Sequence, residues 1–259
     1  MADARRVRVI GIGSGDPADL TGAARAALDG VAFVIAAEKQ PGDPLLGIRR
    51  LLCERSGVPV VAVPDPPRDR DHPGDYPGAV ADWHEARARA YAAVLAERPG
   101  DVGFLVWGDP SLYDSTLRVA ARLSELVPGT TYDVVPGLAA PQLLAAAHRI
   151  VLHRVGEPVL VTTGRRLSTE PATELAAGNL VVMLDGSLAC LDAAVIADPE
   201  RWDIWWGANL GTSAQRLVHG PLAAVGPQLR AARAEAAAEA GWVMDTYLLR
   251  RTVRGAARG

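Results

Sequence analysis

The chain has 259 residues, of which 49% are hydrophobic and 22% charged, and its formal net charge is −3 at pH 7. This length allows one large domain or two of ordinary size, and the composition predicts a well-filled globular core. The small negative charge argues against nonspecific nucleic-acid binding, which is typical of strongly basic chains. The sequence contains no run of about 18 apolar residues, which is the length that a membrane span requires. No apolar run precedes the first strand, as one would in a signal peptide. We therefore expect a soluble, cytoplasmic protein.

The sequence contains two cysteines, Cys53 and Cys190. They lie far apart and do not form the C-x-x-C pattern of redox motifs and zinc sites. We expect two free, buried thiols in a reducing compartment, and we assign no metal ligands.

Apolar strand-like runs alternate with alanine-rich helical runs in the first half of the chain, which predicts a largely parallel sheet with helices on its faces. The segment 64–78 interrupts this alternation and is rich in proline and charge, so we expect a long loop over a site or at an edge. The expected strands are 7–10, 31–36, 58–63, 102–107 and 132–135, and the expected helices are 21–28, 45–55, a helix from Val80 onwards, 112–126 and 141–148.

The second half of the chain begins after a boundary marked by Gly156 and Pro158. We expect two α/β domains, residues 1–156 and 157–259, and the cleft between such domains is where ligands usually bind. The expected strands of the second domain are 159–163, 180–184, 204–206 and 242–249, and its expected long helix is 227–240.

The first strand runs into Gly11, Gly13 and Gly15, which is most of the dinucleotide fingerprint G-x-G-x-x-G. Asp16 stands where the third glycine belongs, and Pro17 follows it. A carboxylate at this position repels a pyrophosphate, and proline removes one N–H donor. The turn therefore fits a conventional NAD site poorly, and a turn needed only for tight packing stays open as the alternative.

The segment FLVWGDPSLYDST, residues 104–116, repeats the G-D-P of residues 15–17. Asp109 suits a helix N-cap, with Pro110 at the first helical position. Two strand ends that carry G-D-P place carboxylates and exposed backbone around one space. This acidic edge favours a cationic or hydroxyl-rich ligand over a nucleotide polyphosphate.

Three further strand-and-turn segments are VVPGLAAPQ (134–142), VLVTTGRR (159–166) and WWGANLGTSAQRLVHGPLAAV (205–225), in which Asn209, Gly211 and Thr212 form a polar turn. Together with both G-D-P segments, in this order and spacing, they resemble the tetrapyrrole (corrin/porphyrin) methylases over nearly the whole chain. The resemblance implies an α/β protein of two domains of the tetrapyrrole methylase type, with the cofactor cleft between them, and commonly a homodimer. It also implies methyl transfer from S-adenosylmethionine to a carbon of a reduced tetrapyrrole.

Within that family, PDPPRDR, VADWH, WGDPSLYDST and GWVMDTYLLRR resemble the branch of aerobic cobalamin biosynthesis that methylates C1 of precorrin-5 and releases acetate. The resemblance implies that the first glycine turn borders the substrate and that the second G-D-P lies against the methyl donor. The donor carries a positive sulfonium and a neutral ribose and has no phosphate, so the carboxylate of Asp109 does not repel it.

The resemblance also implies the site residues. The implied cofactor contacts are Trp107, Gly108, Asp109, Tyr113, Ala139, Ala140, Leu184, Ala208 and Asn209. The candidates for acid–base catalysis are Asp16, Tyr113, His84 and Asp245, and those for binding substrate carboxylates are Arg68, Arg70, Arg165 and Arg166. Each has a structural alternative: a helix-face histidine at His84, core packing at Tyr113, a hydrogen bond near Thr246 for Asp245, and solvated surface arginines.

Other functions stay open on the sequence alone. The nearest alternative is a sibling methylase that acts on another precorrin, and diphthine synthase and ribosomal-RNA methylases of this fold are more remote. A noncatalytic tetrapyrrole- or nucleotide-binding protein, or an oxidoreductase with a degenerate nucleotide turn, would belong to another class. The acidic balance and the absence of a basic aromatic strip disfavour nucleic acid as a partner.

Overall fold

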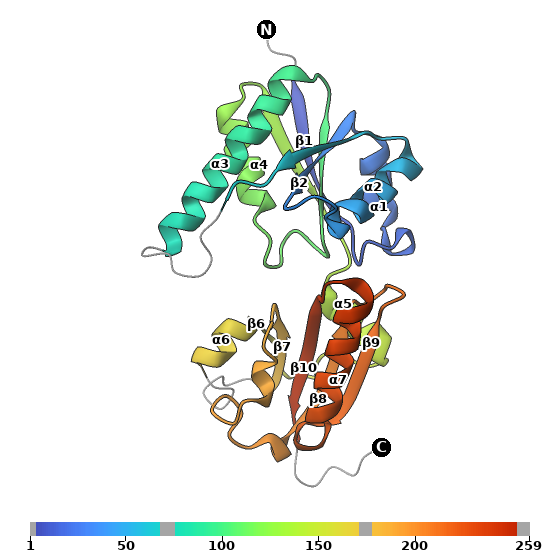
Figure 1. Ribbon diagram of the computed structural model, residues 1–259, viewed down its shortest axis with the longest axis vertical. Helices are drawn as coiled ribbons and strands as arrows, with labels where there is room; N and C mark the ends of the chain where they lie inside the picture. Colours follow the sequence, from blue (N-terminus) through green and yellow to red (C-terminus); the bar gives the residue numbers. More distant parts are fainter. Residues whose placement is uncertain (1–3, 68–75, 171–177, 253–259) are drawn as a thin grey trace. The chain divides into compact units, whose positions relative to one another are not determined.

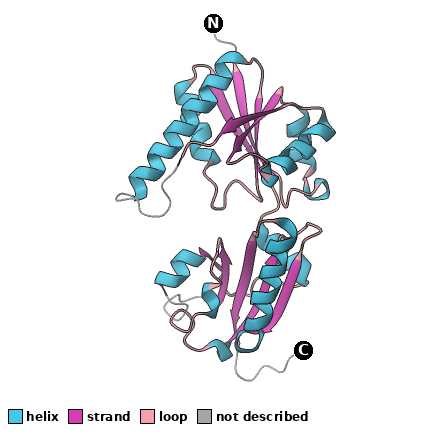
Figure 2. Cartoon of the chain, in the orientation of Figure 1, coloured by secondary structure: helices cyan, strands magenta, loops and turns pink. Residues whose placement is uncertain are grey.

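The computed structural model describes residues 4–67, 76–170 and 178–252 (Figure 1). Contacts divide the chain into two compact units, Met1–Ala139 and Ala140–Gly259. Each unit has its own five-stranded sheet and its own helices (Figure 2). None of the helices in the described ranges combines the length and the hydropathy that crossing a membrane requires.

The sheet of the first unit is parallel throughout, in the strand order β3-β2-β4-β1-β5. Helices α1 and α2 cover one face of it and α3 and α4 the other (Figure 1), which confirms the predicted alternation. The strands are β1 (Arg5–Gly11), β2 (Phe33–Glu38), β3 (Val60–Pro64), β4 (Val102–Val106) and β5 (Thr130–Val135). The helices are α1 (Gly22–Asp29), α2 (Pro44–Ser56), α3 (Tyr76–Glu97), α4 (Thr116–Leu126) and the short 3-10 helix η1 (Pro17–Asp19).

The strands of this sheet are apolar on both faces because helices cover both. On the α1–α2 face, Ile10 and Leu105 belong to one buried cluster. On the α3–α4 face, Val9 and Phe104 belong to a second cluster, together with Leu123 of α4. Adjacent residues of one strand thus serve opposite cores, as the two-residue period of a strand requires.

The sheet of the second unit is mixed, in the order β6-β7-β10-β8-β9. Only β6 and β7 pair in parallel, whereas β10 and β8 run antiparallel to their neighbours. The strands are β6 (Leu160–Thr163), β7 (Asn179–Met183), β8 (Trp202–Ala208), β9 (Arg216–Pro221) and β10 (Asp245–Arg251). The helices are α5 (Ala140–His148), α6 (Gly164–Thr169), α7 (Leu222–Ala240) and the 3-10 helices η2 (Ala189–Leu191) and η3 (Pro199–Arg201).

Among the elements of the second unit that differ from the sequence expectation are β9 and α7. The edge strand β9 was not expected, because its sequence RLVHGP carries few apolar residues and contains Gly220 and Pro221. Helix α7 begins at Leu222 and holds Pro227 inside it, whereas the sequence predicts that proline as the first residue of the helix. Pairing with β8 makes the segment of β9 a strand, and packing of Leu222 in the core places the start of α7 at that residue.

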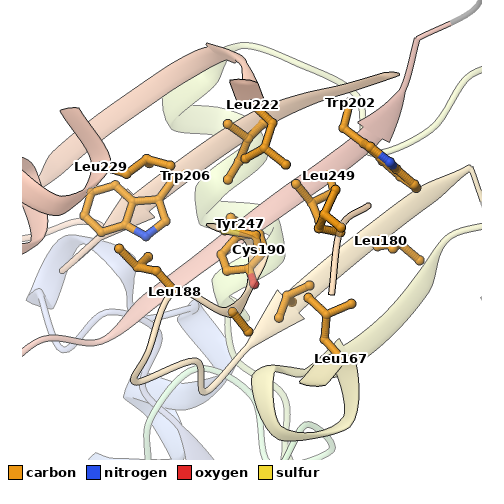
Figure 3. Packing of buried hydrophobic residues seen from close by; sticks show 14 of the residues in the cluster. Leu167, Leu180, Leu188, Cys190, Trp202, Trp206, Leu222, Leu229, Tyr247 and Leu249 are labelled. Atoms are coloured by element: carbon orange, nitrogen blue, oxygen red, sulfur yellow. The ribbon is translucent and has the colours of Figure 1, made fainter. Parts of the chain in front are cut away.

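The core of the second unit is built around large aromatic side chains (Figure 3). Trp202, Trp206 and Tyr247 are fully buried, and Leu222 and Leu229 of α7 pack into the same cluster.

The two cysteines, Cys53 and Cys190, are buried and form no disulfide, as expected. Burial raises the pKa of Cys53 to about 11 and that of Cys190 to about 12, so neither thiol is a reactive nucleophile near neutral pH.

The division between the units lies after Ala139, ahead of the predicted boundary after residue 156. The intervening segment belongs with the second sheet, because Leu144 of α5 packs against the strands β7 and β10. His148 Nε2 also lies 2.9 Å from the carbonyl oxygen of Trp206, and Arg250 donates to the carbonyl of Val151. The glycine and proline near residue 157 precede β6 and do not separate the two cores.

His148 gives the second unit a testable dependence on pH. Burial lowers the pKa of His148 from 6.5, the nearby His219 lowers it further, and the hydrogen bond to Trp206 opposes both. The unfolded chain therefore binds more protons than the folded one between the two pKa values, so stability decreases as the pH falls below the unfolded pKa. His148→Gln should flatten this decrease between about pH 7 and pH 5.

The measurement is urea unfolding followed by tryptophan fluorescence at several pH values. The matched control is His153→Gln, because His153 is exposed. An unchanged pH slope in His148→Gln would contradict the assignment.

Candidate functional site

Three loops pack against one another at the carboxyl edge of the first sheet, after β1, β4 and β5. The N–H of Gly108 donates to the carbonyl of Gly13 at 2.8 Å, and the N–H of Gly13 donates to the carbonyl of Gly108 at 3.2 Å. A Cβ at Gly11 would lie 2.5 Å from the nitrogen of Gly137, and a Cβ at Gly137 would lie 2.2 Å from the carbonyl oxygen of Gly108. Only glycine permits such an approach of backbones, so these glycines have a packing role.

The remaining part of the first glycine turn contacts Trp107, the residue that follows β4. Gly15 has φ +88°, and a Cβ there would lie 2.5 Å from the ring of Trp107. The side chain of the exposed Asp16 accepts a hydrogen bond from the N–H of Ala18 at 2.7 Å and caps η1. The turn thus presents a carboxylate and a capped 3-10 helix, which agrees with the expectation that it does not bind a pyrophosphate.

Asp109 is not a helix N-cap, and that prediction was wrong. Helix α4 begins only at Thr116, because the residues after Asp109 form turns. One carboxylate oxygen of Asp109 accepts from the N–H and hydroxyl of Ser111, and the other accepts from the N–H of Gly137 at 2.9 Å. Partial burial alone would raise the pKa of Asp109, but these hydrogen bonds hold it below its ordinary value. An ionised Asp109 therefore ties the loop after β4 to the loop after β5.

The other predicted site residues of the first unit differ in their exposure. Tyr113 is 47% exposed and has φ +52°, so it does not pack in the core. His84 lies on α3 with its ring centroid 5.1 Å from that of Trp83. Ala139 is buried at the end of the unit. Arg68 and Arg70 lie outside the described residues.

Four predicted residues of the second unit, Leu184, Ala208, Asn209 and Asp245, lie at one edge of its sheet. Because β10 runs antiparallel to β7 and β8, its first residues pair with the last residues of both, Thr246 with Met183 and Asp245 with Ala208. Leu184 follows β7 with φ +54° and is 65% exposed. The backbones of β7, β8 and β10 thus bring the predicted contacts of this unit to one place.

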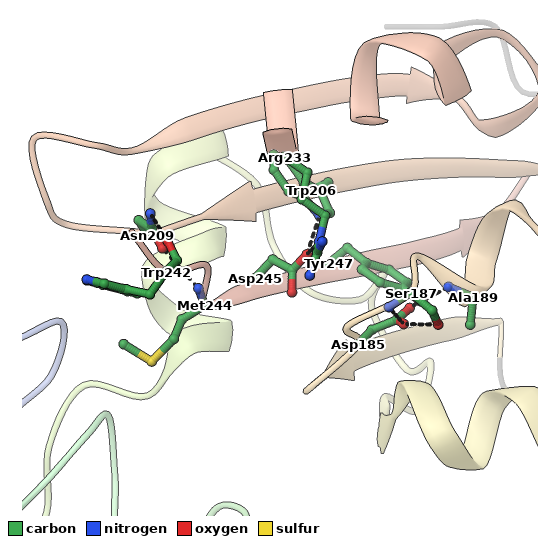
Figure 4. A network of polar contacts seen from close by, with 10 residues as sticks. All are labelled: Asp185, Ser187, Ala189, Trp206, Asn209, Arg233, Trp242, Met244, Asp245 and Tyr247. Atoms are coloured by element: carbon green, nitrogen blue, oxygen red, sulfur yellow. Dashed lines mark hydrogen bonds and ion pairs between the residues drawn. The ribbon is translucent and has the colours of Figure 1, made fainter. Parts of the chain in front are cut away.

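Asn209 follows β8 and holds this edge together (Figure 4). Its backbone N–H donates to the carbonyl of Met244, and its side-chain oxygen accepts from the N–H of Met244, both at 2.9 Å. Its side-chain nitrogen donates to the carbonyl of Trp242 at 3.3 Å. The buried amide therefore fixes the segment before β10 against the turn after β8, a turn that Thr212 closes by donating to the carbonyl of Asn209.

Asp245 has structural partners and a nearly inaccessible side chain. Its Oδ2 accepts from Nε of Arg233 at 3.0 Å and from the ring nitrogen of Trp206 at 3.3 Å (Figure 4). Burial raises the pKa of Asp245, and the two donors oppose this. With its side chain 4% exposed, Asp245 fits the structural alternative better than catalysis, although its partners are not those near Thr246 that the sequence suggests.

The candidate substrate arginines in the second unit lie on α6. Arg165 and Arg166 are both exposed, and Arg166 forms an ion pair with Glu170 at 3.0 Å. Because the side chains of Arg165 and Arg166 are exposed, a ligand can reach them. The exposed ion pair of Arg166 contributes little to stability, so little is lost if a ligand replaces Glu170.

Backbone strain coincides with the predicted contacts. Three of the five non-glycine residues with positive φ in the described part of the chain are Tyr113, Leu184 and Asn209. Bulky residues rarely adopt this region, and where they do the strain clusters at functional sites. No sequence signal reveals it. Sequence reasoning also missed Ser111 and Arg49, of which the second stacks on the ring of Trp107.

Taken by itself, the exposed surface at each of these edges suits a group that is partly apolar and carries no phosphate. Tyr113 and Leu138 follow strands of the first sheet, and Leu184 and Met244 lie at the described edge of the second; each exposes 37% or more of its surface. Exposed apolar side chains fit an adenosyl group and its thioether chain, and the ionised Asp109 tolerates a sulfonium.

This fold is that of an S-adenosylmethionine-dependent methyltransferase. The family model of the tetrapyrrole (corrin/porphyrin) methylases matches residues 6–226, and the chain belongs to that family.

Among its relatives, a precorrin-6A synthase [deacetylating] from Sinorhizobium sp. is 41% identical over 97% of this chain and 98% of its own length. The crystal structure of a putative cobalamin synthesis related protein (CobF) from Corynebacterium diphtheriae matches with 37% identity and a TM-score of 0.78, over 96% of this chain and 99% of that one. A uroporphyrin-III C-methyl transferase from Thermus thermophilus, complexed with S-adenyl homocysteine, shares the fold at 20% identity and a TM-score of 0.58, over 98% of this chain and 96% of that one.

The glycine contact at the first edge predicts an effect on both stability and ligand binding. Gly137→Ala should lower the free energy of unfolding by about 2 kcal/mol or more, because the added Cβ meets the backbone of Gly108 and that backbone cannot move without breaking the contact. The control is Gly22→Ala, whose Cβ meets nothing within 4 Å at the start of α1.

The two variants are compared by urea unfolding and by calorimetric titration with S-adenosylhomocysteine. Gly22→Ala should match or slightly exceed the parent in stability. A Gly137→Ala protein with parental stability and affinity would show that the close approach is not required.

Proposed function

We propose that this chain methylates C1 of precorrin-5 and removes its acetyl group. Precorrin-5, S-adenosylmethionine and water then give precorrin-6A, S-adenosylhomocysteine and acetate. The observation that carries this proposal is the 41% identity to a precorrin-6A synthase [deacetylating], over nearly the whole of both chains. The 37% identity to a CobF protein over 96% of this chain supports the same pathway.

The proposed donor contacts are the strand-end residues of each unit. In the first unit they follow β4 and β5, and in the second they follow β7 and β8 or begin α5. What supports them is the shared position at strand ends, the strained backbone at three of them and the exposed apolar side chains nearby. The residues proposed are Trp107, Gly108, Asp109, Tyr113 and Ala139, and Ala140, Leu184, Ala208 and Asn209.

Methyl transfer makes small electrostatic demands on the protein. The displacement at the sulfonium methyl is in line, and the sulfide leaves without charge. The main task of the proposed contacts is therefore orientation, with the attacking carbon held about 3–3.5 Å from the methyl group. Rigid loops serve this task, and those of the first edge are fixed by the Gly108–Gly13 hydrogen bonds and by Asp109.

Removal of the acetyl group needs proton transfer, because water must attack a carbonyl. We propose Asp16 and Tyr113 for this step, since both are exposed and follow strands at the same edge of the first sheet, with His84 as a further candidate. Asp245 is the weakest of the original candidates because Arg233 and Trp206 bind its carboxylate. Arg165 and Arg166 are proposed to bind carboxylates of the substrate, and Arg68 and Arg70 remain candidates on sequence grounds.

The proposed setting is a homodimer in the cytoplasm that acts on a small tetrapyrrole and binds no nucleic acid. The resemblance to the methylase family suggests the dimer. The net charge of −3 supports the exclusion of nucleic acid.

The reaction itself is tested by incubating the purified protein with precorrin-5 and S-adenosylmethionine. Acetate and S-adenosylhomocysteine should form in equal amounts, because one methyl transfer accompanies each deacetylation. Absence of acetate would show that precorrin-5 is the wrong intermediate and would favour a sibling methylase. Binding of NADH but not of S-adenosylhomocysteine would remove the methylase proposal altogether.

Asp109 is tested by Asp109→Ala, which removes hydrogen bonds to an ionised group and frees the loop after β4. The dissociation constant for S-adenosylhomocysteine should rise about tenfold or more. The control is Asp101→Ala, because Asp101 precedes the same strand at its opposite end and pairs with Arg6. Equal affinities for the two variants would show that the donor binds elsewhere.

A further inference from the structure

The first sheet opens at its carboxyl edge between β2 and β4. These strands pair only as far as Val34 and Gly103, although β2 continues along β3 to Glu38 and β4 continues along β1 to Val106. The helix that follows β2 covers one face of the sheet and the helix that follows β4 covers the other (Figure 1). In parallel sheets, ligands bind at the carboxyl ends of two neighbouring strands whose following helices lie on opposite faces.

The side chain of Arg49, from α2, fills this opening. Its Nε donates to the carbonyl of Leu105 at 3.0 Å, and its Nη1 donates to the carbonyl of Leu45 at 3.2 Å. The next carbonyl of β4, that of Val106, faces β1 and accepts from the N–H of Ile12, so the Leu105 carbonyl faces β2. Arg49 thus replaces the hydrogen-bond partner that the parted strand no longer provides, and a buried carbonyl without one is costly.

The same guanidinium lies over Trp107. Its Cζ is 5.4 Å from the centroid of the indole ring, within the range of a cation–π attraction. On another side, the ring packs so closely against Gly15 that a Cβ there would lie 2.5 Å away. Trp107 is therefore held between Arg49 and the first glycine turn, immediately before Gly108.

The carboxylates near Arg49 are bound to other groups. Asp43 caps α2 by accepting from the N–H of Leu45 at 2.9 Å, and Asp114, in the loop after β4, accepts from the N–H of Thr116 at 2.5 Å. Burial lowers the pKa of Arg49, and the field of Asp43 opposes this. The charge of Arg49 is thus directed at two carbonyls and one aromatic ring.

We propose that Arg49 is a positioning residue of the methyl-donor site, which holds Trp107 and thereby the turn at Gly108 and Asp109 in its binding conformation. This inference rests on the proposed function, which places the donor at that turn. Arg49 acts through Trp107 and does not touch the donor. Lysine would keep the charge but lacks the planar fork that reaches two carbonyls and stacks on a ring.

The first test measures the affinity for S-adenosylhomocysteine by calorimetry and the KM for both substrates. Arg49→Met should raise the dissociation constant and the KM for S-adenosylmethionine about tenfold, through loss of the cation–π contact and of hydrogen bonds from a charged group. The KM for the precorrin should stay unchanged. Arg49→Lys should recover part of the affinity. The control is Arg50→Met, which changes the exposed neighbouring arginine on the same helix and should leave both values unchanged.

The second test is a double-mutant cycle with Trp107→Leu. If Arg49 acts through the ring, Arg49→Met should weaken binding by less than about twofold once the ring is gone, because the two effects are coupled. The same loss in both backgrounds, or an unchanged affinity in a folded Arg49→Met or Arg49→Lys protein, would overturn the inference. Unchanged affinity in Asp109→Ala as well would instead show that the donor site itself is misplaced.

Discussion

The close packing of three backbone loops at the carboxyl edge of the first sheet is the constraint on which the proposed site depends. Gly11, Gly108 and Gly137 come from the ends of three different strands. A Cβ at Gly11 or Gly137 would meet the backbone of a neighbouring loop, and Gly108 has φ +62°, which favours glycine. Because the backbones touch, the loop after β4 has little freedom, and one carboxylate, that of Asp109, is enough to fix it to the loop after β5. Orientation of a methyl group requires rigidity of this kind.

The second unit reaches an ordered edge in a different way. Its strands are antiparallel around β10, and buried polar side chains make the connections there: Asn209 binds the segment before β10, and Asp185 accepts hydrogen bonds from the N–H of Ala189 and the hydroxyl of Tyr247 (Figure 4). Such networks are specific only when every member is satisfied. This explains why Asp245, a candidate base on sequence grounds, is bound by Arg233 and Trp206.

A turn that resembles a dinucleotide motif therefore serves a different purpose in this methylase. In a nucleotide-binding fold, the glycines free N–H groups for a phosphate, whereas here the N–H of Gly13 is used by Gly108 and Asp16 carries a charge of the same sign as a phosphate. The opening of the sheet between β2 and β4 is filled by Arg49, which also lies over the ring of Trp107. The first edge thus offers carboxylate, aromatic and backbone surface, which agrees with a sulfonium donor better than with a dinucleotide.

The sequence by itself determined the alternation of strands and helices in the first unit, the glycines of the two G-D-P turns and the family, because these depend on local periodicity and on short motifs. Tertiary structure decided the edge strand β9, the start of α4 at Thr116 and the place of α5 with the second sheet, because partners distant in the sequence determine them. The same holds for single site residues: only tertiary contacts make Asp245 a buried ion-pair partner and bring Arg49 over the ring of Trp107. The strained backbone of Leu184 carries no signal in residue type, since packing around a turn imposes it.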